Sequence, residues 1–120
     1  MLRIKAFRNA FKGMIFFLRF ERHAIIHLIA AFLVCLAGIW FELEIWEWVS
    51  LFFAIALVLV SEIINSSIER LTDLISPHYS KKAGAVKDLG AAAVLTASGF
   101  AAMVGLFIFA PRIIALLPLP

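Results

Sequence analysis

Cysteine and charge are both scarce in this sequence. Its 120 residues include one cysteine, Cys35, so an intrachain disulfide and a cysteine metal cluster are both excluded. Charged residues make up 16% of the chain and hydrophobic residues 64%, whereas a little under half of an average soluble domain is apolar. The mean hydropathy is +1.04. This composition predicts a small integral-membrane protein with one membrane domain, residues 1–120, in which Cys35 is a packing residue.

The sequence signatures of common nucleotide-binding and nucleic-acid-binding proteins are also missing. Neither a Walker A sequence nor a protein-kinase glycine-rich loop occurs, so any nucleotide site is of another kind. Basic residues are present, but they adjoin the apolar runs and belong to no recognised nucleic-acid-binding fold. We therefore expect no nucleic-acid partner.

Three long apolar runs organise the chain. Each approaches the roughly 20 residues that a helix needs to cross a bilayer. The Ser76-Pro77 step ends the second helix, because the residue before a proline is disfavoured in helical conformation. Lys87 and Asp88 are then expected just before the third span or in its first turn. The predicted fold class is all-α integral membrane, with three transmembrane helices contained in about 24–41, 45–75 and 85–110, plus an N-terminal amphipathic surface helix over 1–20.

The basic residues predict how these helices are oriented. Lysine and arginine cluster in the N-terminal segment and between the second and third runs, whereas the first connection, "ELEIWE", carries only acids. By the positive-inside rule the N-terminus and the second connection are cytoplasmic. Arg112, on the outer side, is the exception. The basic, phenylalanine-rich N-terminal segment is expected to lie on the inner leaflet, although a simple orientation signal is the alternative.

An acidic face follows directly after the second apolar run. Steps of three, four and four residues place Glu62, Asn65, Glu69 and Asp73 on one side of a helix. Carboxylates near hydrocarbon cost a few kcal/mol each, so a compensating group is needed. Mg²⁺, which takes oxygen ligands, is the simplest candidate. The alternative is a solvated helix end that pairs with Arg70 and neighbouring lysines, a description that suits Asp73 better than Glu62.

Glu21 supplies a further carboxylate at the start of the first span. Its expected depth matches that of Glu69, which makes a two-helix magnesium site reasonable. Lys87, Asp88 and two basic residues of the surface helix border the same face. Carboxylates, cations and a membrane boundary together suggest phosphoryl transfer to a lipid.

Three stretches of sequence resemble one known family. "EIINSSIERLTDLI", followed by "KDLGAAAVL" and preceded by "FKGMIFFLRFERHAIIHLIAA", is similar to the prokaryotic diacylglycerol kinase family over about residues 3–112. The resemblance implies an ATP-dependent lipid kinase of the plasma (inner) membrane of a bacterium, which is a homotrimer, uses Mg²⁺ and ATP, and forms its active sites between subunits. The acceptor is the hydroxyl of undecaprenol or of diacylglycerol, and "ERHAIIH", "DLISP" and "IFAPRI" lean slightly toward the polyprenol kinases.

The resemblance also implies roles for individual residues. Glu62 is the expected general base for the lipid hydroxyl, and Glu21 and Glu69 are the expected magnesium ligands, which also contact the nucleotide phosphates. The other implied roles are nucleotide binding for His78, Tyr79, Ser80, Lys87 and Asp88, support of the site for Asn65 and Asp73, and lipid or phosphate contact for Arg3 and Trp40.

Two other functions and one other metal site stay open at this point. A small proton-coupled transporter predicts a carboxylate near mid-bilayer, and a non-catalytic membrane oligomer predicts no ATP binding. His23 and His27, four residues apart, could bind a metal, but a hydrogen bond inside the helix bundle is the preferred interpretation of His27.

Overall fold

The structure, a computed structural model, describes residues 2–78 and 80–117, with side chains from Ile4 onward. Within them it contains four helices and no strand: α1 (Leu2–Phe20), α2 (Arg22–Trp40), α3 (Ile45–Ile75) and α4 (Lys81–Leu116). The last three are long and apolar enough to cross a membrane. The predicted all-α membrane fold, with three spanning helices and a shorter N-terminal helix, is therefore confirmed.

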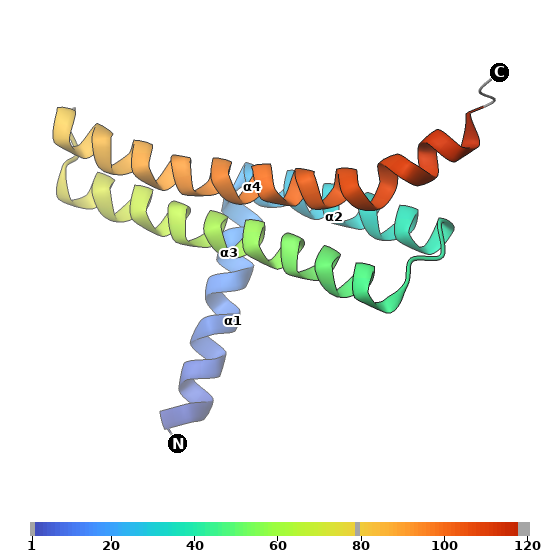
Figure 1. Cartoon of the computed structure of the whole chain (residues 1–120). Helices are drawn as coiled ribbons and strands as arrows, with labels where there is room; N and C mark the ends of the chain where they lie inside the picture. Colours follow the sequence, from blue (N-terminus) through green and yellow to red (C-terminus); the bar gives the residue numbers. More distant parts are fainter. Residues whose placement is uncertain (1, 79, 118–120) are drawn as a thin grey trace.

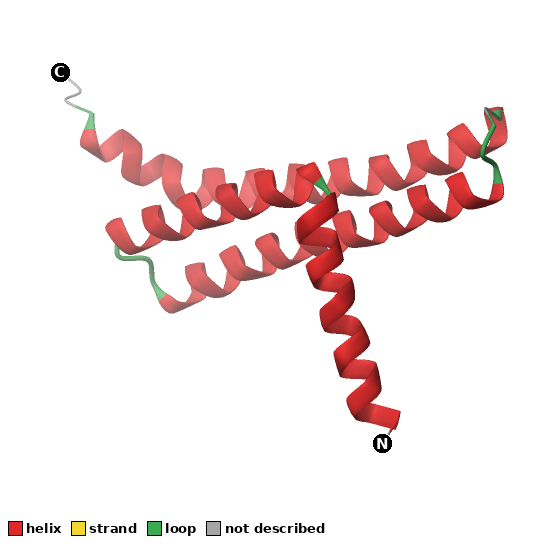
Figure 2. Ribbon diagram, turned by 180° about the vertical axis from the view of Figure 1, so that it is seen from behind, coloured by secondary structure: helices red, strands yellow, loops and turns green. Residues whose placement is uncertain are grey.

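The three long helices form one elongated bundle. α3 and α4 are antiparallel neighbours along most of their length, and α2 packs beside α3 over only part of it (Figure 1). α1 leaves the bundle at a steep angle from the start of α2, as both views show (Figure 2). The connected ends of α3 and α4 consequently extend beyond the point where α1 departs. This arrangement places the polar second half of α3 beside α4 and near the α1–α2 junction.

Local sequence explains most of the helix ends. α3 ends at Ile75, directly before the Ser76-Pro77 step, as the proline rule predicts. α4 begins at Lys81, earlier than the predicted start at 85, because the Ser80 side chain caps the helix by accepting from the Ala83 amide at 3.5 Å. Lys87 and Asp88 therefore lie inside α4, past its first turn.

α4 also continues beyond its predicted end. It reaches Leu116 through Pro111, and its last turns bend away from the bundle (Figure 1). A proline inside a helix removes one backbone hydrogen bond and crowds the preceding turn, which accounts for a bend at this place.

Most apolar side chains of the bundle face outward. Leu43, Leu51 and Ile108 form a small buried cluster near the α2–α3 turn, whereas Phe53 is 76% exposed and Phe107 82% exposed. Water would not tolerate so large an apolar surface on a single chain. Lipid, or lipid together with further protein, must cover it, in keeping with a membrane protein.

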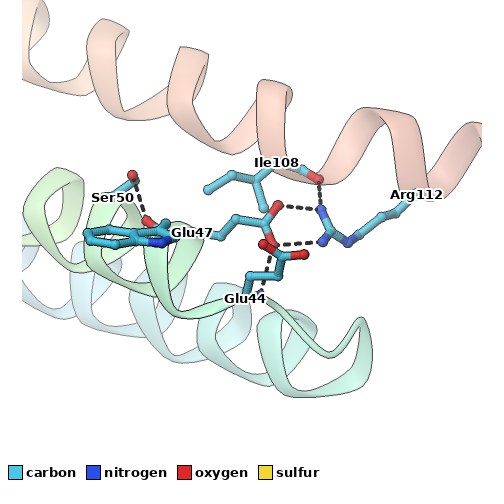
Figure 3. A network of polar contacts seen from close by, with 6 residues as sticks. Glu44, Glu47, Ser50, Ile108 and Arg112 are labelled. Carbon is cyan, nitrogen blue, oxygen red and sulfur yellow. Dashed lines mark hydrogen bonds and ion pairs between the residues drawn. The ribbon is translucent and has the colours of Figure 1, made fainter.

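An ion pair joins α3 to α4 at the end of the bundle that carries the α2–α3 turn. Arg112 donates to both Glu47 oxygens, at 2.8 and 2.7 Å, and to the Ile108 carbonyl at 2.7 Å (Figure 3). The Glu44 amide donates to the same Glu47 carboxylate at 2.9 Å, which completes a capping box at the start of α3. Arg112, the exception in the orientation analysis, is thus half of a bidentate pair that sequence spacing did not reveal.

Candidate functional site

An open polar groove forms where the start of α2, the middle of α3 and α4 meet. Its volume is roughly 350 Å³, and small or apolar residues of α4, including Ala91 and Ser98, form one wall. The opposite wall contains the carboxylate and amide residues Glu21, Glu62, Asn65 and Glu69. The structure therefore brings together the predicted base, both predicted magnesium ligands and the predicted supporting asparagine.

Glu62 is the buried carboxylate of this groove. Only 6% of the residue is exposed, so it needs a partner, since an unpaired buried charge is strongly unfavourable. His27 of α2 provides one, with Nε2 at 2.9 Å from the Glu62 Oε1 atom. The predicted hydrogen bond of His27 inside the bundle is confirmed. Within the described residues no group of three or more histidine, cysteine, aspartate or glutamate side chains assembles into a metal site, so neither His23 with His27 nor the carboxylates of the groove form a complete set of metal ligands on their own.

Asn65 connects Glu69 to α4. Its amide nitrogen donates to the Glu69 Oε1 atom at 3.0 Å, while its buried amide oxygen has no hydrogen-bond partner in the described part of the chain. That oxygen lies against Gly90 of α4, where a Cβ atom would overlap it. A side chain at position 90 would therefore displace the Asn65 amide, and sequence reasoning missed this contact. The contact joins Asn65 of α3 to Gly90 of α4, so it can be recognised only when the packing of these two helices is known.

Glu21 is held from the side by Arg70. Arg70 donates to the Glu21 Oε1 atom from Nη2 at 2.6 Å and from Nε at 3.1 Å, and its guanidinium lies over the Phe16 ring at 4.6 Å from the centroid. Arg70 therefore joins α3 to the α1–α2 junction, and it does not pair with Asp73 as the solvated-helix-end alternative proposed.

The donor set of the groove fits a magnesium ion. Glu21 and Glu69 come from different elements and line the same space, and Mg²⁺ in phosphoryl-transfer sites is commonly held by one or two carboxylates together with substrate phosphates. Each carboxylate uses Oε1 in its contacts to Arg70 or Asn65. The Oε2 atoms take part in none of these bonds, so they are the atoms that would hold Mg²⁺.

The remaining predicted residues lie outside the groove. Lys87 of α4 forms an ion pair with Asp73 of α3 on the extended part of the α3–α4 pair. Asp88 and His78 are exposed, and Ser80 caps α4. Tyr79 and the side chain of Arg3 lie outside the described residues. Trp40, 81% exposed, ends α2 at the opposite end from Glu21, about 28 Å away at 1.5 Å per residue, so a single chain does not bring it to the groove.

A second groove adjoins the first. It lies between α1 and α3, has a volume of roughly 300 Å³ and is largely apolar, with Met14 and Phe17 among its lining residues. Glu21 and Ser66 line both grooves. The chain has three helices able to span a bilayer, and its carboxylate groove adjoins an apolar groove. The fold and the site therefore define a membrane protein that can bind polar and apolar groups side by side.

Comparisons with known proteins give this membrane protein a family. The profile described as Prokaryotic diacylglycerol kinase matches residues 8–109. The undecaprenol kinase of Bacillus subtilis (strain 168) is 35% identical over 109 residues, which cover 91% of this chain and 89% of that protein. The diacylglycerol kinase of Escherichia coli (strain K12) is 35% identical over 78 residues, 65% of this chain and 61% of that protein. The chain belongs to the prokaryotic diacylglycerol kinase family and is a lipid kinase.

Proposed function

We propose that this lipid kinase transfers the γ-phosphate of ATP to the hydroxyl group of undecaprenol. The observation that carries the proposal is the convergence of Glu21, Glu62 and Glu69 on one groove beside an apolar groove. Undecaprenol is favoured over diacylglycerol because the similarity to the Bacillus undecaprenol kinase covers 91% of the chain, against 65% for the Escherichia diacylglycerol kinase.

The proposed reaction needs one base and a site for polyphosphate. Glu62 accepts the proton of the lipid hydroxyl as its oxygen forms a bond to the γ-phosphorus; the bond from that phosphorus to the β-phosphate oxygen breaks, and ADP leaves. Glu21 and Glu69 would hold Mg²⁺, which when bound would neutralise phosphate charge. Glu62 and Glu69 are seven residues apart on α3, about 10 Å along the axis, so the base lies deeper in the bundle than the metal ligands.

Two apolar and basic features support the remaining parts of the proposal. The apolar groove between α1 and α3 leads the lipid hydroxyl toward Glu62 through the shared residues Glu21 and Ser66. Lys87 and Asp88 lie near the start of α4, on the part of the α3–α4 pair that also carries Glu69. They contact the nucleotide after the ion pair between Lys87 and Asp73 opens. The basic residues near the connection between α3 and α4 orient this end of the bundle, together with the N-terminus, toward the cytoplasm in the plasma membrane.

Further copies of the chain complete the proposed assembly. The extensive outward apolar surface of α2 and α4, which includes Phe107 at 82% exposure, offers contact area for a homotrimer. A second subunit then supplies the groove with residues such as Trp40, which lies too far from the groove of its own chain.

The test is phosphate transfer in mixed micelles. Purified protein receives Mg²⁺ and ATP labelled at the γ-phosphate, with undecaprenol and diacylglycerol supplied separately and a Glu62→Gln variant as control. We expect label in undecaprenol that is lost in the variant. Label in diacylglycerol alone would overturn the choice of acceptor, and label in neither lipid from folded protein would overturn the proposed reaction.

A further inference from the structure

We propose that His27 is a positioning residue for this kinase, which fixes the Glu62 carboxylate in the orientation that accepts the lipid proton. The inference rests on the proposed function, because it assumes that Glu62 is the base. Its starting observation is the 2.9 Å contact between the His27 Nε2 atom and the Glu62 Oε1 atom, which joins α2 to α3 across 35 residues of sequence.

The chemistry of the two side chains determines the direction of this hydrogen bond. An ionised carboxylate can only accept hydrogen bonds, so the Nε2 atom must carry the proton when Glu62 is ready to act as a base. The bond occupies Oε1 and leaves Oε2, which makes no hydrogen bond with any described residue. His27 thereby compensates the buried charge and also selects the oxygen that meets the substrate.

The surroundings of His27 explain how it can hold Glu62 in place. Its side chain is 26% exposed, and Ala24, one turn earlier on α2, is fully buried. His27 lines an apolar cavity of about 260 Å³ between α2, α3 and α4. Ser98 of α4 lines both this cavity and the polar groove. The imidazole therefore lines the apolar cavity and directs Nε2 toward Glu62, which lines the adjoining polar groove.

Loss of the donor should affect turnover more than nucleotide binding. In His27→Leu, Glu62 keeps its place in the chain but loses the bond that fixes its carboxylate. Misplacement of a reacting group by about 1 Å can reduce a rate about 100-fold, so we expect kcat to fall by about 10-fold to 100-fold. The KM for Mg-ATP should change less than about twofold, because Glu21 and Glu69 keep their own partners, Arg70 and Asn65.

A conservative replacement and a neighbouring control separate positioning from general damage. The amide nitrogen of glutamine reaches about as far as the Nε2 atom of histidine, so His27→Gln should recover most of the lost kcat. His27→Asn carries the same amide on a shorter side chain and should not. Ser61→Ala removes a hydroxyl beside Glu62 that donates to the Val58 carbonyl at 2.8 Å, and this variant should keep wild-type kcat.

A double-mutant cycle tests whether His27 acts through Glu62. In a Glu62→Gln background, His27→Leu should change the residual rate by less than about twofold, because residues that act as a unit are strongly non-additive. A full additional loss in that background would overturn the proposal, since His27 would then act independently of the base.

The outcomes distinguish this inference from the proposed function. If the wild-type protein phosphorylates neither lipid, both the proposed function and the role of His27 are overturned. If the wild type is active and His27→Leu keeps its kcat, only the role of His27 is overturned. If His27→Leu fails to elute as folded protein in detergent, the comparison of His27→Gln with His27→Asn decides: higher kcat for glutamine supports the proposal, and equal kcat overturns it.

Discussion

At the scale of single residues, each carboxylate of the groove has a different partner. Glu62 contacts a histidine, Glu69 an asparagine and Glu21 an arginine. A cationic guanidinium, a neutral amide and an imidazole impose different demands on a carboxylate, so three chemically similar side chains can serve different purposes. In the proposed mechanism the deepest carboxylate, Glu62, is the base, and the two shallower ones, Glu21 and Glu69, hold the metal.

Replacing Glu69 should weaken magnesium binding. Glu69→Gln keeps the size of the side chain and can still contact Asn65, but it removes the negative charge. Hydrogen bonds and contacts to charged groups are worth roughly 1.5–3 kcal/mol, so we expect the Mg²⁺ concentration for half-maximal phosphate transfer to rise about tenfold or more. Glu42→Gln, on the exposed α2–α3 turn, is the matched control. An unchanged magnesium requirement in Glu69→Gln would remove Glu69 from the metal site.

The sequence revealed some of these residues and not others, for a physical reason. Glu62, Asn65 and Glu69 could be grouped in advance, because helical periodicity alone places them on one face. His27, Gly90 and Arg112 could not, since their partners lie on other helices and depend on how the helices cross. The Ser80 cap was available from sequence, as serine before a helical run is a common start signal.

At the scale of helices, the closest approach of α3 and α4 at the site depends on Gly90. Gly90→Ala would place a methyl group against the Asn65 amide oxygen, and overpacking of this kind typically destabilises by about 1–3 kcal/mol. We expect lower thermal stability in detergent and a marked loss of kinase activity, since Asn65 must move away from Glu69. Gly84→Ala is the control on the same helix, because nothing lies within 4 Å of its added methyl group. Equal behaviour of the two variants would contradict the role of Gly90.

The Glu47–Arg112 pair should stabilise the opposite end of the α3–α4 pair. Both side chains are only about a quarter exposed, at 26% and 28%, and the geometry is bidentate, which is the favourable case for an ion pair. Arg112→Gln and Glu47→Gln should each lower the thermal midpoint in micelles. The double variant should lose less than the sum of the two single losses. Strict additivity would show that the contact contributes nothing. Because the pair lies far from the groove, the KM for Mg-ATP should not change.

At the scale of the whole molecule, the position of the groove depends on which way the bundle spans the membrane. The turn between α2 and α3 and the connection between α3 and α4 lie at opposite ends of the bundle (Figure 1). With ATP as the proposed phosphate donor, the end that carries Glu69 and Lys87 is expected to face the cytoplasm, where ATP is available. The basic residues of that end favour this orientation, and the acidic α2–α3 turn then faces outward.

Cysteine labelling in whole cells tests this topology. Replacing Cys35, the only cysteine, by serine gives a background for two single-cysteine variants, Glu42→Cys in the α2–α3 turn and Lys82→Cys at the start of α4. Both positions are exposed. A membrane-impermeant maleimide should label Glu42→Cys in intact cells and Lys82→Cys only after permeabilisation. The reverse pattern would place the carboxylate groove at the outer surface, where ATP is not supplied, and the kinase mechanism would then lack its phosphate donor.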